Sequence, residues 1–430
     1  MRVAVIGSGI SGMGAAWLLS PAHEVDLFEA DDRLGGHAHT HDVLLGGTTV
    51  AADTGFMVYN ERTYPNLIRF FERLGVEHKE SDMSFSVQCP AEGVEWAGKG
   101  LDSIFAQRMN VASPVFLRML VDIVRFSGMA ERLLADDSVD SLTLGELLGR
   151  EGLGKGFTDW YLIPMGSAIW STPPGQMLGF PAKSFLRFCD NHGLLHVRGK
   201  PQWRSVIGGS RTYVDSAARA ISGEIRVSAP VERVERKSDE VVVVWPDGER
   251  RYDEVVIASH ADQALSMLAD PSDAERDILS AFGASPNDTV LHTDTSFLPS
   301  RERAHASWNY YSEAAEMSAG GLSLTYYLNR LQPLGVDDPL LVTLNPVREP
   351  DPGRVIGRIP YTHPVFSAGA IAAQGRLDDI QGTRRTWFTG AWQRYGFHED
   401  GLLSAVRVAE AMGATLPWGA ELDDTRTQVV

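Results

Sequence analysis

The sequence has 430 residues and a formal charge of −17, which results from 39 Lys and Arg against 56 Asp and Glu. This balance argues against a nucleic-acid-binding protein and against electrostatic docking on anionic lipid, because both depend on Lys and Arg. The hydrophobic content of 43% and the charged content of 22% exclude a disordered or fibrous chain, and the length predicts two or three domains.

The cysteines and the apolar runs bear on the location of the protein. Cys89 and Cys189 are too few for a disulfide framework and lack the paired spacing of a zinc or redox motif. No apolar run approaches the roughly 18 residues that span a bilayer, and the first residues do not resemble a cleavable signal. We expect a cytoplasmic protein without a transmembrane segment. No set of His, Cys or carboxylates has metal-ligand spacing, so no metal is expected.

The chain begins with the pattern of a β-α-β unit. Residues 3–6 form a short apolar run typical of a buried parallel strand, residues 13–20 are rich in Ala and Leu, and residues 25–28 supply a second strand. Between the first strand and the helix lies Gly7-Ser8-Gly9-Ile10-Ser11-Gly12, and Glu29 ends the second strand. This order of elements and residues is the fingerprint of dinucleotide binding.

Each part of the fingerprint has a physical role. Gly7 permits the tight turn, Gly9 lets the backbone approach a pyrophosphate, and Gly12 lets the helix pack on the strand, while the helix N-terminus offers free N–H groups to the phosphates. Glu29 can accept both ribose hydroxyls and would repel a 2′-phosphate, which disfavours NADP. The cofactor-binding residues expected here are Gly7, Gly9, Ile10, Ser11, Gly12 and Glu29.

Residues 30–37 separate FAD from NAD. With Glu29 they read Glu29-Ala30-Asp31-Asp32-Arg33-Leu34-Gly35-Gly36-His37, which resembles the E-x-x-x-R-x-G-G extension of glutathione-reductase-type flavoproteins, specifically the flavin amine oxidase superfamily. The resemblance implies that Arg33 and the glycine pair continue the pyrophosphate cradle of FAD. His37 stands where amine oxidases usually have a second Arg. The further cofactor-binding residues implied are Ala30, Arg33, Gly35, Gly36 and His37. No second glycine fingerprint follows, so a separate NAD(P)H site is not expected.

Residues 53–60 match the stretch that runs past the isoalloxazine ring in that family. Gly55 would permit close approach there. The resemblance implies cofactor contacts for Thr54, Gly55 and Phe56.

Residues 113–134 have the spacing of an amphipathic helix. Its apolar face is expected to hold Phe116, Leu117, Leu120, Ile123, Val124 and Met129. Two interpretations are open: the helix covers a core, or it forms the wall of an apolar tunnel or a lipid-facing surface. The second interpretation includes peripheral contact with a membrane.

Four segments in the middle of the chain have the β-branched content of strands: 225–227, 231–234, 241–245 and 252–258. The turn Pro246-Asp247-Gly248 between the last two predicts a hairpin. The pattern resembles the inserted β-meander of the flavin amine oxidases, in which the backbone of Val231 would contact the adenine. The alternative is that Val231 belongs to a purely structural strand.

Near the C-terminus, residues 386–390 are expected to form a buried strand that closes on Gly390, and residues 402–412 have apolar residues at helical spacing. This resembles the closing segment of flavin amine oxidases, where the helix N-terminus points at the flavin pyrimidine and stabilises negative charge on the reduced flavin. Ala391 occupies the place of the usual acidic residue. The cofactor-binding residues implied are Gly390, Asp400, Gly401 and Leu402.

The candidate catalytic residues are His398, Glu399 and Tyr395. His398 falls where amine oxidases have an aromatic residue of the cage beside the ring, and an imidazole of near-neutral pKa could accept a proton while Glu399 tunes it. The alternative is that His398, Glu399 and Asp400 cap the final helix. Tyr395, like Trp392, either flanks the cofactor or belongs to the core.

Two smaller expectations concern other side chains. No cysteine follows Cys189, which excludes a cysteinyl flavin link in the closing segment, so FAD is expected to bind noncovalently. His192 and His292 are expected to make structural hydrogen bonds.

Further blocks extend the resemblance over nearly the whole chain. Residues 160–165, 188–193, 291–294, 307–311 and 396–401 resemble a bacterial subgroup of this superfamily, usually labelled as predicted NAD/FAD-binding or FAD-dependent oxidoreductases. Its members are associated with cyclopropane-synthase-like methyltransferases and with modification of methyl-branched fatty acyl chains. The resemblance therefore implies a fatty-acyl or lipid-like substrate.

Taken together, these segments predict an α/β protein. It should combine a Rossmann-like FAD-binding domain, with a parallel sheet and an inserted β-meander, and a mixed α+β substrate domain. The FAD-binding domain is expected to be discontinuous, with residues 1–75, 200–285 and 375–430. The substrate domain should comprise residues 76–199 and 286–374.

The leading hypothesis is an FAD-dependent oxidoreductase that takes hydride from an apolar substrate and so desaturates or oxidises it. Two other activities fit the same cofactor. One is a redox-neutral double-bond isomerase that returns the hydride at another carbon, and the other is an amine oxidase, which the lack of a clear paired-aromatic cage disfavours. The non-enzymatic alternative is a flavin-binding partner protein whose apolar helix is the interface.

Overall fold

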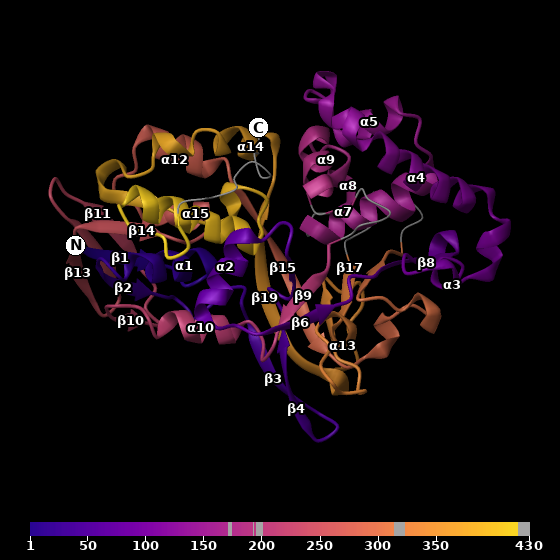
Figure 1. The fold of residues 1–430 in the computed structure, drawn as a ribbon, viewed down its shortest axis with the longest axis horizontal. Helices are drawn as coiled ribbons and strands as arrows, with labels where there is room; N and C mark the ends of the chain where they lie inside the picture. Colours follow the sequence, from indigo (N-terminus) through magenta and orange to yellow (C-terminus); the bar gives the residue numbers. More distant parts are fainter. Residues whose placement is uncertain (171–173, 192, 195–200, 314–322, 420–430) are drawn as a thin grey trace.

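A five-stranded parallel sheet lies at one end of the molecule, on the left in Figure 1. The computed structural model describes residues 1–170, 174–191, 193–194, 201–313 and 323–419. The strand order is β10-β2-β1-β14-β20, and all neighbours are parallel. The strands are β1 (Arg2–Ile6), β2 (Glu24–Phe28), β10 (Ile225–Arg226), β14 (Glu254–Ile257) and β20 (Thr386–Phe388). Segments that are far apart in the chain thus meet in one sheet, which confirms the Rossmann-like fold.

Helix α1 (Ile10–Leu19) connects β1 to β2 and packs on α15 (His398–Ala411). Because α1 is enclosed between the sheet and a second helix, it is apolar on nearly every side and almost completely buried. A Cβ on Gly14 would lie 2.5 Å from Leu402 Cδ1, so glycine permits the close helix contact. The β-α-β unit expected at residues 3–28 is confirmed, and α15 begins one turn before the expected residue 402.

The expected β-meander is present as β11 (Arg233–Arg236), β12 (Val241–Trp245) and β13 (Gly248–Tyr252). The predicted hairpin partner was wrong. The strand that pairs with β12 is β13, whereas β14 leaves the hairpin and enters the parallel sheet between β1 and β20. The side chains of Val255 and Ile257 are completely buried, as the centre of a parallel sheet requires, while residues 248–251 stay largely exposed.

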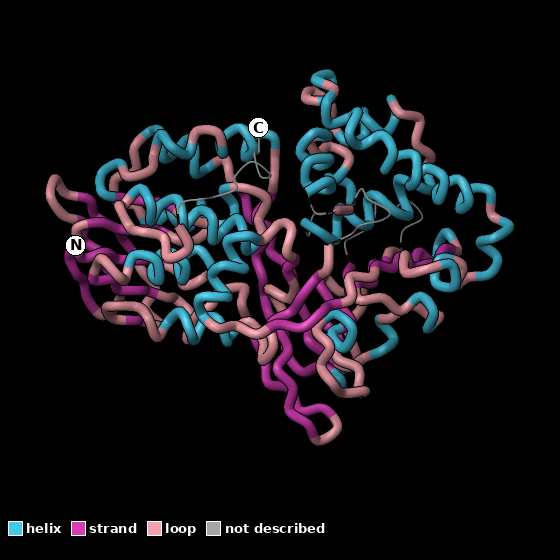
Figure 2. The backbone as a smooth tube through the Cα atoms, in the orientation of Figure 1, coloured by secondary structure: helices cyan, strands magenta, loops and turns pink. Residues whose placement is uncertain are grey.

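The second part of the molecule is built on a seven-stranded mixed sheet, in the order β19-β15-β18-β17-β16-β7-β8. Its strands are β7 (Phe85–Cys89), β8 (Val94–Ala97), β15 (Gly283–His292), β16 (Trp308–Tyr311), β17 (Ser323–Tyr327), β18 (Leu341–Leu344) and β19 (Val355–Val365). The pair β16 and β7 is parallel, and the other neighbours are antiparallel. Figure 2 shows these strands between the parallel-sheet part and a group of helices. His292 makes its expected structural hydrogen bond, to Thr343 Oγ1 at 2.8 Å; His192 lies outside the described residues.

Two smaller sheets link the parts. They are the hairpin β3 (Thr40–Leu45) and β4 (Thr48–Asp53), and the three-stranded sheet of β5 (Tyr59–Asn60), β9 (Trp203–Val206) and β6 (His78–Ser81). Val43 and Val50 of the hairpin share a core with Leu291 and Val342 of the mixed sheet. This portion of the segment 1–75, which was expected in the FAD-binding domain, therefore packs on the mixed sheet.

The remaining helices fall into two groups: those from α3 to α9 cover the far end of the molecule, on the right in Figure 1, and the others flank the two sheets. They are α2 (Pro65–Leu74), α3 (Leu101–Ile104), α4 (Pro114–Ala135), α5 (Leu144–Arg150), α6 (Lys155–Phe157), α7 (Ile163–Trp170), α8 (Pro174–Met177), α9 (Ala182–Asn191), α10 (Arg211–Ala218), α11 (Ala261–Met267), α12 (Asp273–Ser280), α13 (Leu328–Leu331) and α14 (Ala368–Gln374). In the part of the chain that the structure describes, no helix is long and apolar enough to cross a bilayer.

Helix α4 is the amphipathic helix expected at residues 113–134, but it buries a different face. The buried residues are Phe116, Met119, Asp122, Phe126, Ala130 and Leu133. Leu117 and Val124, which were expected to be buried, are 41% and 61% exposed. Asp122 explains the rotation, because its buried carboxylate accepts hydrogen bonds from Arg118 Nε at 2.9 Å and Arg125 Nη1 at 2.6 Å. The two arginines make an acidic residue acceptable on the inner face.

A buried ion pair anchors the meander to α12. Arg236 donates two hydrogen bonds to the Glu275 carboxylate, and the two side chains are 0% and 1% exposed. Removal of one partner leaves the other charge buried and unpaired, so we expect Arg236→Met to lower the free energy of unfolding by about 3–5 kcal/mol in urea titrations. Arg251→Met in β13, where the side chain is well exposed, should change it by less than about 0.5 kcal/mol. Equal losses in the two variants would contradict this assignment.

Candidate cofactor and active site

The glycines of the first loop occupy three different environments. Gly7 has a φ of +100°, and a Cβ there would lie 2.7 Å from Ala258 O at the end of β14. A Cβ on Gly12 would lie 1.8 Å from Gly7 O, so the helix can begin this close to the strand only with glycine. Around the Cβ position of Gly9, no atom of the described residues lies within 4 Å. Gly9 therefore leaves open space on the side where a pyrophosphate would approach.

The N-terminus of α1 opens onto this loop. Its N-cap is Gly9, which provides no side-chain cap, and its first turn contains no acidic residue. The first helical hydrogen bond runs from Met13 N to Gly9 O at 2.9 Å, so the N–H groups of Ile10, Ser11 and Gly12 have no helical partner. An uncapped N-terminus of a ten-residue helix suits a phosphate group.

Ser8 and Glu29 tie the loop to the second strand. Glu29 Oε2 accepts from Ser8 N at 2.8 Å and from Ser8 Oγ, and Oε1 accepts from Asp31 N at 2.9 Å. Ser8 Oγ in turn accepts from Gly35 N at 3.0 Å. Sequence reasoning did not single out Ser8, although its place between two fingerprint glycines was a usable signal. Glu29 lies against the loop, and its role in binding ribose stays a prediction.

The second glycine loop touches the first. Gly36 has a φ of +56°, and a Cβ there would lie 3.0 Å from Gly9 Cα. Arg33 Nη2 donates to Gly36 O at 2.8 Å, so the guanidinium braces the loop from behind. Ala30 is exposed beside Glu29, and a contact between Ala30 and the cofactor stays a prediction.

Thr54, Gly55 and Phe56 run alongside the second loop. Thr54 N donates to His39 O at 3.0 Å, and Phe56 N donates to His37 O at 2.7 Å. A Cβ on Gly55 would lie 2.2 Å from His37 O, so only glycine fits. The segment expected beside the isoalloxazine therefore contacts the loop expected beside the pyrophosphate.

The closing segment reaches the same place from the other end of the chain. Gly390 follows β20, and α15 begins after its N-cap Phe397. Asp400 Oδ2 accepts from Phe397 N at 2.9 Å, which confirms the capping role expected of Asp400. The N-terminus of α15 thus lies close to the start of α1, where a Cβ on Gly401 would come within 2.8 Å of Ile10 Cγ2.

The side chains of Ile10 and Leu402, expected among the cofactor-binding residues, pack between α1 and α15 instead. Leu402 is fully buried and contacts Gly14, and Ile10 contacts Gly401. Any contact of these two residues with a cofactor is limited to the main chain, because their side chains fill the helix interface.

His398 lies in the first turn of α15 and stacks on Phe56. The ring centroids are 3.7 Å apart with an interplanar angle of 14°, and Tyr213 Oη is 3.2 Å from His398 Nε2. Burial lowers the pKa of His398 to about 3. The near-neutral pKa expected from the sequence is therefore wrong, because removal from water disfavours the charged imidazolium. The neutral ring can form a wall and a hydrogen bond, but it is a poor base.

The hydrogen bonds of Glu399 go to the start of α2 and not to His398. Its Oε1 accepts from Asn66 N at 3.0 Å and Asn66 Nδ2 at 2.6 Å, and Oε2 accepts from Leu67 N at 2.9 Å. Asn66 and Leu67 begin α2, so Glu399 caps α2 and holds it against α15. Burial raises the pKa of Glu399 to about 7. These contacts give Glu399 a structural role at the start of α2, and its expected catalytic role stays a prediction.

Trp392 and Tyr395, for which two interpretations were open, have different surroundings. Trp392 Nε1 donates to Ser259 O at 3.1 Å and its ring packs on Phe282, so Trp392 belongs to the core. Tyr395 packs on Phe188 of α9, at 5.7 Å between ring centroids, and its buried hydroxyl has no hydrogen-bond partner among the described residues. Tyr395 therefore stands where the closing segment meets the helical part of the molecule.

Arg394 is a candidate that sequence reasoning missed. It is 4% exposed, its Nε lies 3.9 Å from Asp400 Oδ1, and Nη1 and Nη2 have no hydrogen-bond partner among the described residues. Two buried guanidinium nitrogens without hydrogen-bond partners are costly, so their presence here suits an anionic group. The only signal in the sequence was an Arg inside an apolar closing segment.

Val231 lies two residues before β11 and is not in a strand, so the expected strand 231–234 begins too early. The side chain is half-buried and packs on the core between the meander and the parallel sheet. The contact of Val231 with adenine stays a prediction.

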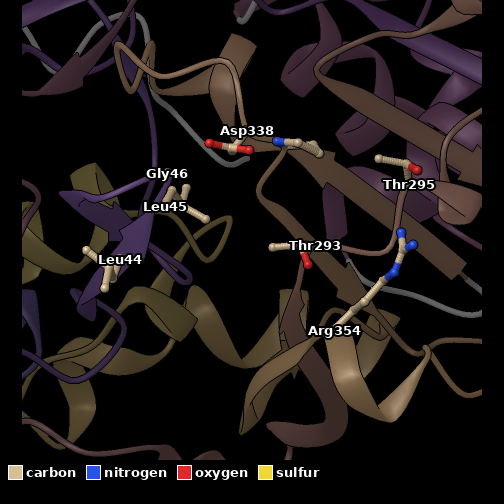
Figure 3. A pocket seen from close by; sticks show the side chains of 8 residues that line it. Leu44, Leu45, Gly46, Thr293, Thr295, Asp338 and Arg354 are labelled. Atoms are coloured by element: carbon tan, nitrogen blue, oxygen red, sulfur yellow. The ribbon is translucent and has the colours of Figure 1, made fainter.

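A surface pocket lies away from all of these residues. It has a volume of about 390 Å³ and sits between the turn of the β3–β4 hairpin and the mixed sheet (Figure 3). It is lined by Leu44, Leu45, Gly46, Thr293, Thr295, Asp338, Pro339 and Arg354. None of these residues belongs to the two glycine loops or the closing segment, so we do not assign the cofactor site to this pocket.

The family model of flavin-containing amine oxidoreductases matches residues 10–333. AofH of Mycobacterium tuberculosis, whose name places it among flavin-containing monoamine oxidases, is 24% identical over 287 residues, which are 63% of this chain and 59% of AofH. The chain thus spans less than two thirds of the length of that relative.

Solved structures share the whole fold at low identity. A CLA-producing fatty acid isomerase from P. acnes has a TM-score of 0.66 at 14% identity, over 95% of this chain and 98% of its own. Cyclohexylamine oxidase from Brevibacterium oxydans has a TM-score of 0.68 at 17% identity, over 96% and 99%. These likenesses show a common fold and do not choose between the two chemistries.

Two neighbouring glycines provide a matched test of the cradle. Because a Cβ on Gly12 would collide with Gly7 O, we expect Gly12→Ala to destabilise the protein by about 1–3 kcal/mol. Gly9 has free space around its Cβ position, so Gly9→Ala should keep the thermal unfolding temperature and weaken FAD binding instead. Differential scanning fluorimetry and flavin fluorescence measure the two effects. Normal FAD affinity in folded Gly9→Ala would contradict the assigned cradle.

Proposed function

The chain belongs to the family of flavin-containing amine oxidoreductases, and we propose that it is an FAD-dependent oxidoreductase that takes hydride from an apolar, fatty-acyl or lipid-like substrate. FAD binds noncovalently in this proposal. The parallel sheet, the meander and α15 form the FAD-binding domain, and the mixed sheet with α3–α9 forms the substrate domain.

The observation that carries the proposal is the convergence of four segments on one place. The loop 7–12, the loop 35–37, residues 54–56 and the start of α15 are in contact, and a Cβ on Gly12 or on Gly55 would collide with a main-chain oxygen. An open glycine loop beside an uncapped helix N-terminus fits the pyrophosphate of a dinucleotide. The stacked pair of Phe56 and His398 then stands next to this cradle.

FAD supplies the hydride acceptor when it is bound, and the protein orients the substrate and excludes water. His398 remains neutral and, with Phe56, offers a flat aromatic wall held in place by Tyr213. Such a wall can hold a substrate carbon at a fixed distance, and it adds no competing base. Desaturation would pass one hydride to FAD and release one proton from the neighbouring carbon to solvent, so the double bond forms with no charge left on the chain.

Two groups at the start of α15 can stabilise negative charge: the helix N-terminus and the side chain of Arg394. The helix N-terminus carries a partial positive charge, and Arg394 adds a buried guanidinium 3.9 Å from Asp400. We assign to this pair the stabilisation of negative charge that develops when hydride is accepted. Asp400 limits the excess positive charge in the unloaded protein.

The substrate side is apolar. Phe188 of α9 stacks on Phe397 at 5.2 Å between centroids and contacts Tyr395, and these residues share a core with Phe366 and Trp170. Phe188 and Trp170 are buried in this core, so an acyl chain would meet it at the partly buried Phe366 and Phe397, without loss of hydrogen bonds. This supports an acyl substrate over a cationic amine.

The test is anaerobic reduction of the purified holoenzyme. Free fatty acids, phospholipids and primary amines are each mixed with the protein, and bleaching of the visible flavin band is followed. We expect an acyl compound to bleach the flavin, and His398→Ala to slow bleaching by about 10²-fold without loss of bound FAD, because the wall is gone. Tyr213→Phe, which keeps the ring and removes one hydrogen bond, should have a smaller effect. Bleaching by amines alone favours an amine oxidase, and turnover without bleaching favours an isomerase.

The same proposal includes contact with a membrane surface. Residues 101–124 expose seven large apolar side chains, against six in the rest of the described chain. These seven define the apolar face: Leu101, Met109, Val111, Val115, Leu117, Val121 and Val124. The cations of this stretch are ion-paired with Asp82, Asp102 and Asp122, so the contact rests on the apolar side chains and not on net charge. Helices α3 and α4 form the end of the molecule farthest from the parallel sheet in Figure 1.

Vesicle binding tests this face. We expect the protein to sediment with vesicles of phosphatidylcholine and phosphatidylglycerol, and the double variant Val121→Glu, Val124→Glu to bind at least about tenfold more weakly, because two exposed apolar side chains of this face become charged. Ile356→Glu, which changes an exposed apolar residue of β19, serves as the control and should bind normally. Absence of vesicle binding, or a dimer that the double variant breaks, would contradict the membrane proposal.

A further inference from the structure

Three histidines from distant parts of the chain form a cluster beside the glycine loops, with His37 next to the other two. The ring centroid of His37 lies 5.3 Å from that of His363 and 6.5 Å from that of His260, and its ring stacks on Tyr361 at 5.0 Å. His37 follows the glycine pair, His363 lies in β19, and His260 is the N-cap of α11, three residues after β14. The sequence drew attention to His37 but not to His260 or His363.

The position of this cluster is that of the dinucleotide crevice. In the parallel sheet the chain order reverses between β1 and β14, and ligands of such sheets bind outside the carboxyl ends of the strands at this point. Gly7 leaves the carboxyl end of β1, and His260 stands two residues past Ala258, which touches the Gly7 position. His37 follows Gly36, which touches Gly9. The cluster therefore borders the loop that the cradle offers to a pyrophosphate.

The permanent cation beside the cluster, Arg33, is bonded to the loop backbone. The guanidinium of Arg33 donates to the carbonyl oxygens of Leu34, Gly36 and Ala38, so it is engaged with the loop backbone. His37 Nε2 is buried and has no hydrogen-bond partner among the described residues. An unpartnered ring nitrogen at the border of an anion cradle is a free site for a proton or a hydrogen bond.

His363 differs from His37 because its tautomer is set. Asn287 Nδ2 donates to His363 Nδ1 at 2.9 Å, and Asn287 Oδ1 accepts from Asn345 Nδ2 at 2.8 Å. These bonds fix the amide and leave His363 neutral with its proton on Nε2. His363 can donate a hydrogen bond, but a proton added to it would face the Asn287 amide. The group free to gain a proton is His37.

In the unloaded protein His37 is uncharged at neutral pH. Burial lowers its pKa well below the usual value, and His363, His260, His398 and Arg33, which face it from β19, from the end of β14, from α15 and from its own loop, lower it further. A doubly negative pyrophosphate bound at the cradle would raise the pKa of His37, because a nearby opposite charge favours the imidazolium.

We propose that His37 is the cation that neutralises the FAD pyrophosphate in this protein, and that it gains one proton when the cofactor binds, with His260 and the fixed donor His363 as positioning residues. The inference rests on the proposed function, since it requires FAD in the cradle. It deepens that function by making retention of the cofactor dependent on pH.

Coupling between FAD binding and protonation of His37 predicts the direction in which FAD affinity changes with pH. Between the pKa of His37 without cofactor and its higher pKa with cofactor, one proton is taken up per FAD, so affinity falls as pH rises, by up to about tenfold per pH unit. Above the higher pKa, no proton is taken up and the dependence disappears. An arginine at position 37 keeps its charge throughout and should abolish the dependence.

The experiment measures FAD dissociation from the purified holoenzyme by flavin fluorescence after dilution, from pH 6.0 to 8.5. We expect the wild-type Kd to rise with pH, His37→Asn to bind more weakly with a flat profile, and His37→Arg to bind with a flat profile and more tightly than wild type at pH 8. His78→Asn changes an exposed histidine of β6 and should keep the wild-type slope. Calorimetry in two buffers of different ionisation enthalpy should give an uptake near one proton for wild type and near zero for both His37 variants.

Two outcomes would overturn the inference: a wild-type Kd that does not change over this pH range, or a slope that persists in His37→Asn. A protein that binds no FAD at pH 6 or at pH 8 would instead refute the proposed function. The two failures are therefore distinguishable.

Discussion

The cofactor site depends on backbone segments that approach one another so closely that a Cβ atom would collide or barely fit. A Cβ on Gly12 would collide with the carbonyl of Gly7, one on Gly55 would collide with the carbonyl of His37, and one on Gly36 would lie 3.0 Å from Gly9 Cα. Because these contacts are made by main-chain atoms, their spacing does not depend on the rotamers of side chains. They lock the two loops and the segment 54–56 into one rigid border. The N-terminus of α15 is added to it by the contact between Gly401 and Ile10. This border fixes the positions of the side chains that follow it, including His37, Phe56 and His398.

Enclosure by that border also sets the charge of the site. Burial lowers the pKa of His37 and His398 and raises that of Glu399, so each of these groups favours its neutral form. The buried charges that remain are few, and Arg394 lies close to only one of them, Asp400. A ligand that brings negative charge into such a site changes the protonation of the groups beside it. Cofactor binding and proton binding are therefore coupled by the same desolvation that keeps the empty site neutral.

The parts that could be predicted from the sequence are those in which local spacing determines structure. The β-α-β unit was recognisable because Gly7, Gly9, Gly12 and Glu29 lie within one short segment and each has one physical role. The buried face of α4 was not, because Asp122 becomes acceptable inside only when Arg118 and Arg125 fold back onto it. Glu399 was misread for a similar reason, since its three donors come from α2, more than 300 residues earlier. The histidine cluster joins three remote segments, and periodicity carries no information on such contacts.

The protonation of the site bears on the substrate, because both candidate chemistries release a proton as well as a hydride. An amine reaches a flavin as a protonated cation and must lose a proton before hydride can leave, so the protein needs an acceptor for it. Desaturation of an acyl chain would pass a hydride to the flavin and release the proton of the neighbouring carbon. Next to the aromatic wall, His398 has a pKa of about 3, so it cannot take either proton near neutral pH. Burial raises the pKa of Glu399 to about 7, but its carboxylate is occupied by three N–H donors of α2. The fold is shared by enzymes of both kinds, so neither the architecture nor these two groups alone decide between them.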